Sequence, residues 1–82
     1  MRANMSKNGL IKDAKRLHER LRAKSIHLMT INVAIDVHEK ATQAIEDASW
    51  IHEFIIAPER TRGEILKGLG MLRDAFRTIR DL

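Results

Sequence analysis

The chain has 82 residues, of which 44% are hydrophobic, 32% are charged and none is cysteine, and its formal net charge is +4. Its length excludes more than one domain and leaves a core near the lower limit for folding alone, so we expect a partner subunit. The lack of cysteine excludes disulfides and thiolate metal sites, which fits a reducing cytoplasm, and no apolar run has the length of a signal peptide or a membrane span.

Charge is distributed unevenly along the chain. Residues 1–24 hold eight basic residues against two acidic ones, residues 25–57 hold one against five, and residues 58–82 hold six against four. Basic ends therefore flank an acidic middle. Such a partition is typical of binding to a polyanion, of charge complementarity between subunits, or of ordinary solvated helix faces.

The N-terminal segment has the pattern of a basic amphipathic helix. Its apolar residues are spaced four, three and four positions apart, at Leu10, Ala14, Leu17 and Leu21. Lysines and arginines occupy much of the remaining helical wheel. We therefore expect residues 1–25 to form a basic N-terminal arm. Docking of residues 8–24 on an anionic membrane is an alternative for the same pattern.

The next segment, residues 26–38, changes from helical to alternating periodicity. Its β-branched residues from Ile31 to Val37 alternate with polar or small ones, which predicts one short strand. A helix is the alternative, because neither glycine nor proline interrupts this segment and Leu28, Ile31 and Ile35 also fit helical spacings. Periodicity alone leaves both interpretations open.

A helix is predicted to follow the alternating segment directly. Asp36 and Glu39 have the spacing of a capping box, which starts a helix. Proline disfavours helical geometry in the residue before it, so Pro58 ends this helix at Ala57. The expected buried stripe comprises Val37, Ala41, Ala44, Ala48, Ile51 and Ile55. The last turns are too apolar to face water on all sides, which predicts contact with a second helix or a second subunit.

The last helix has the clearest pattern in the sequence. Thr61 and Glu64 form a second capping-box pattern. Five apolar residues follow at spacings of four, three, four and three: Ile65, Leu69, Leu72, Phe76 and Ile79. Gly68 and Gly70 within this helix each cost roughly 1 kcal/mol relative to alanine. Their presence indicates either close approach of a neighbouring backbone or simple tolerance.

Residue types suited to catalysis or metal binding do not cluster in the sequence. The four histidines are scattered: His18, His27, His38 and His52. They lack the short spacing of metal ligands, and no HExxH, GxGxxG or P-loop pattern occurs. The neighbouring carboxylates Glu46 and Asp47 point in different directions on a helix. We therefore predict a protein that is not an enzyme and that uses no cofactor or metal.

The order of elements resembles the ribbon-helix-helix family of DNA-binding repressors and plasmid partition proteins. The resemblance covers roughly residues 28–80 and depends on the alternating segment 30–36 and the helix opening at residues 61–66. In that family the strands of two chains pair as an antiparallel ribbon in the major groove. The resemblance implies a mainly α fold with a basic N-terminal helix or arm, one short strand and two helices, as an intertwined homodimer. Residues 26–82 would form the dimerisation and binding domain.

The resemblance also implies roles for individual residues. The candidates for reading bases are Thr30, Asn32 and Ala34. The candidates for contacting phosphate are Arg60, Thr61 and Arg62, together with Arg16, Arg20, Arg22 and Lys24 of the arm. The candidates for the dimer interface or core are Ile31, Val33, Ile35, Trp50, Ile51, Phe54, Ile55, Ile65, Leu69, Leu72 and Phe76.

Two functions follow from these patterns. The first is a small dimeric cytoplasmic DNA-binding regulator, such as a transcriptional repressor or a plasmid or phage control protein. The alternative holds if residues 26–38 are helical. The chain is then an all-α hairpin or bundle that acts without catalysis, by oligomerising or by inhibiting a partner regulator. Helical content and salt-dependent DNA binding distinguish the two.

Overall fold

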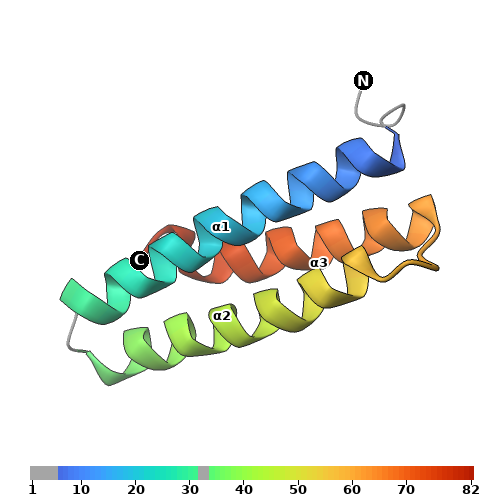
Figure 1. The fold of residues 1–82 in the computed structure, drawn as a ribbon. Coiled ribbons are helices and arrows are strands. Elements are labelled where there is room, and N and C mark those ends of the chain that lie inside the picture. Colours follow the sequence, from blue (N-terminus) through green and yellow to red (C-terminus); the bar gives the residue numbers. More distant parts are fainter. Residues whose placement is uncertain (1–5, 32–33) are drawn as a thin grey trace.

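The computed structural model describes residues 6–31 and 34–82, which form a bundle of three helices (Figure 1). Helix α1 spans Lys7–Ile31, α2 spans Ile35–Ile56 and α3 spans Arg62–Arg80. Helix α2 is antiparallel to both α1 and α3, and each helix packs against the other two. The bundle is slender, with extents of 41 × 24 × 15 Å. None of the helices in these described ranges combines the length and the apolar character needed to cross a membrane.

The predicted strand in residues 26–38 is wrong, and the all-α alternative is the observed fold. Residues 26–31 complete α1, residues 35–38 open α2, and no strand occurs in the described parts of the chain. An intertwined dimer built on a two-stranded ribbon is therefore also wrong. Asn32 and Val33, which the prediction placed in the strand, lie outside the described residues.

Burial of a helical stripe explains why this segment is not a strand. Leu28 is buried in register with Leu21, so one face of α1 remains in the core past residue 25. The β-branched residues Ile26, Ile31 and Ile35 are instead 45%, 62% and 75% exposed. Preference for a strand depends on packing of the branched side chains, and these side chains pack little. The long apolar stripe therefore determined the local structure.

Helix α2 begins and ends close to the expected positions, although its predicted cap is wrong. Its N-cap is Ala34, which makes no side-chain capping hydrogen bond, so Asp36 lies in the first turn and does not act as a cap. There its charge complements the helix dipole. The C-cap is Ala57, as Pro58 predicts. The predicted stripe is buried at Ala41, Ala44, Ala48, Ile51 and Ile55, with Val37 partly buried.

Helix α3 begins with the predicted capping box. The Glu64 backbone N–H donates to Thr61 Oγ1 at 3.2 Å, and the Thr61 backbone N–H donates to Glu64 Oε1 at 2.9 Å. The second bond favours the charged carboxylate and lowers the pKa of Glu64. The buried residues of the helix are Ile65, Gly68, Leu69, Leu72, Ala75 and Ile79.

The core of the bundle is aliphatic. Leucine, isoleucine and alanine make up all of its buried hydrophobic side chains, while Phe54 and Phe76 pack against it from the edge. Alanines predominate in the first half of the α2 stripe, which lets α2 lie close to its neighbours. The surface of the bundle has two grooves, one between α1 and α3 and one between α2 and α3.

Candidate functional site

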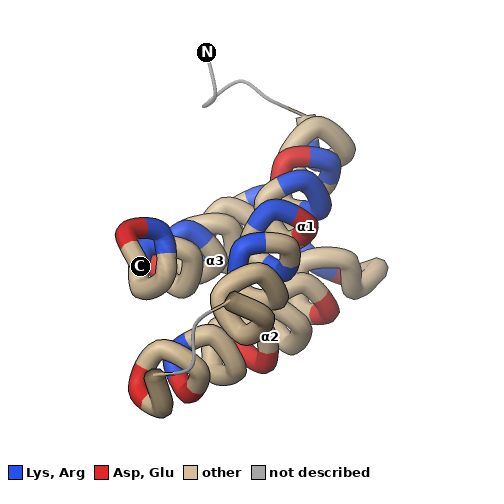
Figure 2. Tube along the Cα trace, turned by 90° about the vertical axis from the view of Figure 1, so that its left-hand side faces the viewer, with Lys and Arg blue, Asp and Glu red and all other residues tan. Residues whose placement is uncertain are grey.

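The three helices differ sharply in charge. Helix α1 carries seven basic and two acidic residues, α2 carries one and five, and α3 carries five and two. Figure 2 shows the basic positions gathered on α1 and α3 and the acidic positions gathered mainly on α2. The uneven charge of the sequence is therefore also a separation in space, and the basic side of the bundle includes the groove between α1 and α3.

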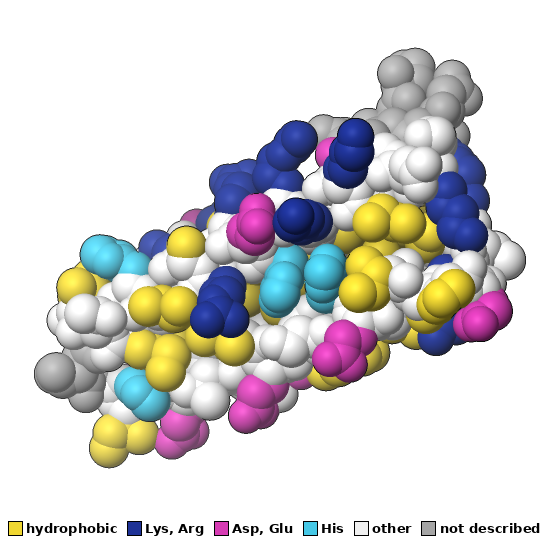
Figure 3. Space-filling view, viewed as in Figure 1, with side chains coloured by type: hydrophobic (Ala, Val, Ile, Leu, Met, Phe, Trp, Pro, Cys, Tyr) yellow, Lys and Arg dark blue, Asp and Glu magenta, His cyan; other side chains and the backbone are white. Residues whose placement is uncertain are grey.

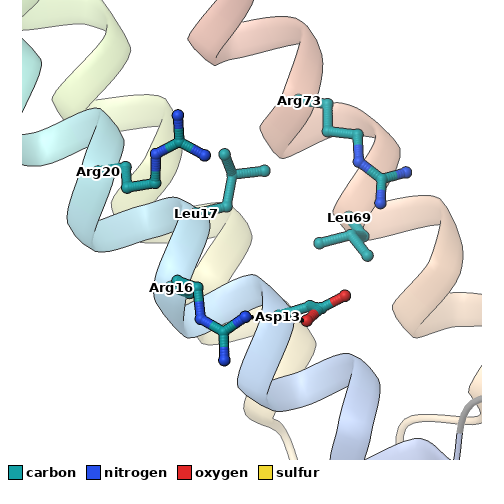
Figure 4. Close-up of a pocket in the computed structure, with 6 residues that line it drawn as sticks. All are labelled: Asp13, Arg16, Leu17, Arg20, Leu69 and Arg73. Carbon is teal, nitrogen blue, oxygen red and sulfur yellow. Dashed lines mark ion pairs between the residues drawn. The ribbon is translucent and has the colours of Figure 1, made fainter.

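That groove, hereafter the α1/α3 groove, combines arginines from two helices (Figure 4). Its lining residues are Asp13, Arg16, Leu17, Arg20, Leu69 and Arg73. The hollow has a volume of about 210 Å³ and opens to solvent. Leu17 and Leu69 form the apolar floor at which the two helices meet, and the guanidinium groups stand around it.

Two arginines of the groove make side-chain contacts. Arg16 Nη1 lies 3.9 Å from Asp13 Oδ1, one turn earlier on α1. The Arg20 guanidinium lies over the Phe76 ring of α3, 5.5 Å from its centroid, in a cation–π arrangement. The ring contact restricts the Arg20 side chain, so less rotamer entropy remains to be lost there when a ligand binds.

The positive surface continues from the groove onto the outer face of α1. Lys12, Lys15, Arg16 and Glu19 line a neighbouring shallow hollow of about 280 Å³. Lys12, Arg16 and Arg20 are four residues apart and form one row on the helix. Arg16 belongs to both hollows, so the row and the groove form one continuous basic surface.

The predicted phosphate-contact residues of the arm have different positions. Arg16 and Arg20 line the α1/α3 groove, and Arg22 is exposed farther along α1. Lys24 Nζ donates to the Leu82 carbonyl oxygen at 3.0 Å, which ties α1 to the C-terminal end of the chain. The arm is not separate from the other helices, because α1 continues through residue 25 as part of the bundle.

The predicted phosphate-contact residues around the start of α3 serve the turn between α2 and α3. Arg60 Nε donates to the Phe54 carbonyl oxygen at 2.8 Å, and its guanidinium lies 3.8 Å from the Phe54 ring centroid. Its Nη1 lies 3.7 Å from Glu64 Oε2. Thr61 is occupied by the capping box, and Arg62 is the first residue of α3. None of these three predicted residues lines the α1/α3 groove.

The predicted base-reading residues do not form a row. The Thr30 hydroxyl donates to the Ile26 carbonyl oxygen at 2.8 Å within α1, Ala34 is the N-cap of α2, and Asn32 lies outside the described residues. A row of alternating side chains requires a strand. Because the described residues contain none, the expected ribbon surface is absent from them.

The predicted dimer and core residues divide between the inside and the outside of one bundle. The buried members are Ile51, Ile55, Ile65, Leu69 and Leu72. The members packed at the edge of the core are Phe54 and Phe76. The exposed members are Ile31, Ile35 and Trp50, and Val33 lies outside the described residues. Ile31 ends α1 and Ile35 begins α2, so both lie at the end of the bundle where these helices meet. Their exposure therefore does not indicate a ribbon interface.

Arg73 was missed as a candidate site residue. Sequence reasoning found Arg16 and Arg20 because they stand in a dense basic segment, whereas Arg73 is an isolated arginine on the polar side of α3. The available signal was its position one residue after Leu72, which places it at the border of the buried stripe. Only the packing of α3 beside α1 brings it to the other arginines.

Two histidine side chains, one from α1 and one from α2, are in contact. The rings of His18 and His52 stack with centroids 4.7 Å apart and an interplanar angle of 15°, and histidine rings lie side by side on the face seen in Figure 3. Burial of the His18 ring is the main cause that lowers its pKa below the ordinary value of 6.5. The charges of His52 and Arg22 lower the pKa further, and Glu19 acts in the opposite sense.

Because the pKa of His18 is lowered in the folded chain, we expect the bundle to lose stability in mild acid. Unfolded His18 binds a proton at a higher pH than folded His18, so the free energy of unfolding falls as pH decreases below about 6.5 and levels off below the folded pKa. We expect His18→Gln to flatten this dependence. Urea unfolding at a series of pH values from about 8 to about 5 measures it.

His27→Gln is the matched control, because His27 is exposed on the same helix. Its unfolding free energy should follow the pH dependence of the parent chain. If His18→Gln and the parent chain showed the same pH dependence, the stacked pair would have no part in it.

Two other features could mark a site: a group of side chains that could bind a metal ion, and a buried polar group without a partner. In the described parts of the chain, no group of three or more His, Cys, Asp or Glu residues is placed to hold a metal ion. Ser25 is buried, and its hydroxyl has no hydrogen-bond partner among those residues.

No family model, curated protein sequence or solved structure matches the chain. The α1/α3 groove, whose lining includes three arginines from two helices, is the candidate site.

Proposed function

We propose that this protein is a non-enzymatic DNA-binding protein that holds the phosphate backbone in the α1/α3 groove and along the outer face of α1. The observation that carries the proposal is the convergence of Arg16, Arg20 and Arg73 from two helices on one groove. A cytoplasmic regulator that acts on DNA is the wider role we propose. Contacts to phosphate would position the protein on DNA without reading sequence.

The charge state of the groove favours an anionic ligand. Three arginines stand against one acidic residue in its lining. Neither Arg20 nor Arg73 forms an ion pair with a carboxylate of residues 6–31 or 34–82. Like charges held close together repel each other, and a bound phosphate relieves that repulsion. Guanidinium groups also match phosphate oxygens with paired hydrogen bonds.

The length of the basic row suits a nucleic acid backbone. From Lys12 to Arg20 the helix rises about 12 Å. One strand of a DNA duplex presents a phosphate about every 3.4 Å along its axis, so a row that lies along this axis passes three or four phosphates. An acidic protein partner fits less well, because stable protein interfaces depend on buried apolar anchors and this groove offers only Leu17 and Leu69.

Salt dependence of DNA binding provides the test. We expect a fluorescently labelled duplex to bind with an affinity that falls steeply as salt increases. Arg20→Ala/Arg73→Ala should weaken binding at least tenfold and reduce the slope of log affinity against log salt by about 2. Fluorescence anisotropy titrations at several salt concentrations measure both quantities.

Lys40→Ala/Arg80→Ala is the matched control. It removes the same amount of charge, but Lys40 lines a hollow between α2 and α3, Arg80 is exposed near the C-terminal end of α3, and neither lines the α1/α3 groove. We expect this variant to keep the parent salt slope. Equal weakening by the two double variants, or no DNA binding by the parent chain, would overturn the proposal. Displacement of DNA by poly-glutamate at an equal concentration of charge would instead favour an acidic protein as partner.

A further inference from the structure

A second groove lies between α2 and α3, on a different face from the arginines. Three neighbouring hollows of about 330, 430 and 220 Å³ share lining residues and form one continuous channel, hereafter the α2/α3 groove. Asp47, Ala75 and Thr78 line the first two hollows, and Trp50, Ile51 and Met71 line the first and third.

The centre of the α2/α3 groove is apolar and exposed. Trp50 is 50% exposed and Met71 is 37% exposed. The Trp50 indole N–H donates to Asp47 Oδ1 at 3.3 Å, so its ring lies on the surface with its polar atom already bonded. Tryptophan is among the residues most enriched where protein interfaces gain most of their affinity. An exposed tryptophan beside a methionine therefore favours a protein partner on this face.

The charges along the α2/α3 groove are arranged so that they match the same groove in a second copy of the chain. Lys67 and Asp74 stand on the same face of α3, seven residues or about 10 Å apart, and Met71 lies midway between them. Trp50 of α2 is level with Met71, because the two residues line two hollows in common. Consider a second copy related to the first by a two-fold axis that lies between the copies, perpendicular to the helices, at the level of Met71. The helices of the second copy then run antiparallel to those of the first. Lys67 of each copy then meets Asp74 of the other, whose Oδ1 also lies 3.3 Å from Arg77 Nη1 on its own helix, in a contact exposed to solvent.

We propose that the α2/α3 groove is the interface of a symmetric homodimer, with α2 and α3 of one copy packed antiparallel on the same helices of the second. The two Trp50 and two Met71 side chains form the apolar centre, and two Lys67–Asp74 contacts flank it. Such an interface is isologous, so each favourable contact occurs twice. The inference does not depend on DNA binding, because the arginines of the α1/α3 groove take no part in it.

Charge reversal tests the pairing across the interface. Sedimentation equilibrium of the parent chain should show a monomer–dimer equilibrium. Lys67→Glu alone and Asp74→Lys alone each turn two attractive contacts into two repulsive ones, and we expect each to raise the dimer dissociation constant about tenfold. The combined Lys67→Glu/Asp74→Lys variant restores opposite charges between copies. Its dissociation constant should return to near the parent value.

Two further variants separate pairing from general effects on the fold. Trp50→Ala should weaken the dimer at least tenfold while circular dichroism shows that the bundle remains folded. Lys15→Glu/Glu19→Lys reverses two exposed charges on α1 and should leave the dimer unchanged. A parent chain that stays monomeric at every concentration would overturn the proposal and leave the groove to a different protein. Failure of the combined variant to recover would overturn the proposed pairing.

Discussion

We expect Leu72→Ala to lower the free energy of unfolding by about 2–5 kcal/mol, as removal of a fully buried leucine does in other small proteins. Leu72 is 0% exposed in the core. Because domains of this size are stable by only about 4–12 kcal/mol, the loss is a large fraction of the total. Urea unfolding followed by circular dichroism measures it.

Leu66→Ala provides the comparison for this prediction. Leu66 lies on the same helix but is 37% exposed, so its truncation removes less buried surface and leaves little or no cavity. We expect a loss of less than about 1 kcal/mol. Equal losses at the two positions would mean that α3 presents a different face to the core.

We expect the same substitution at two glycines of α3 to have opposite effects. A Cβ at Gly68 would lie 2.7 Å from Ile55 Cγ1 and 3.4 Å from Phe54 Cδ2, whereas one at Gly70 would meet nothing within 4 Å. Gly70→Ala should therefore stabilise the protein by about 1 kcal/mol through helix propensity alone. Gly68→Ala gains the same propensity but overpacks the contact with α2, and its net effect should be destabilising.

The difference between the two alanine variants isolates the packing effect. Both glycines lie inside one helix, so the gain in propensity cancels, and the remaining difference should be about 1–3 kcal/mol. Thermal unfolding of the two single variants, followed by circular dichroism, provides the measurement. If Gly68→Ala were as stable as Gly70→Ala, the close approach of α3 to α2 at this point would be incorrect.

The sequence by itself determined the buried stripes of the helices, but not the full length of α1. Stripes at spacings of three and four placed Leu10, Leu21, Ile51, Ile55 and Leu72 in the core, and the structure buries all five. The capping box at Thr61 and the proline after Ala57 marked helix ends correctly. These features depend on residues close together in the chain, so local patterns are sufficient to predict them.

Residues 26–38 show where local patterns were insufficient. Alternation of β-branched residues predicted a strand, and the same residues also fitted a helix. The outcome depended on whether Leu28 could join a core formed with α2 and α3, which are distant in sequence. The capping-box pattern at Asp36 failed for a related reason, because α2 begins at Ile35 before that box can form.

Tertiary structure brought together the residues of both candidate binding surfaces, although Arg16 and Arg20 were already candidates from the sequence. The arginines of the α1/α3 groove come from positions more than fifty residues apart, and Trp50 meets Met71 only because α2 lies antiparallel to α3. A sequence pattern reports which face of a helix is buried, because that face repeats along one segment. It does not report which helices lie side by side, since that depends on the fit of all three buried faces in one small core.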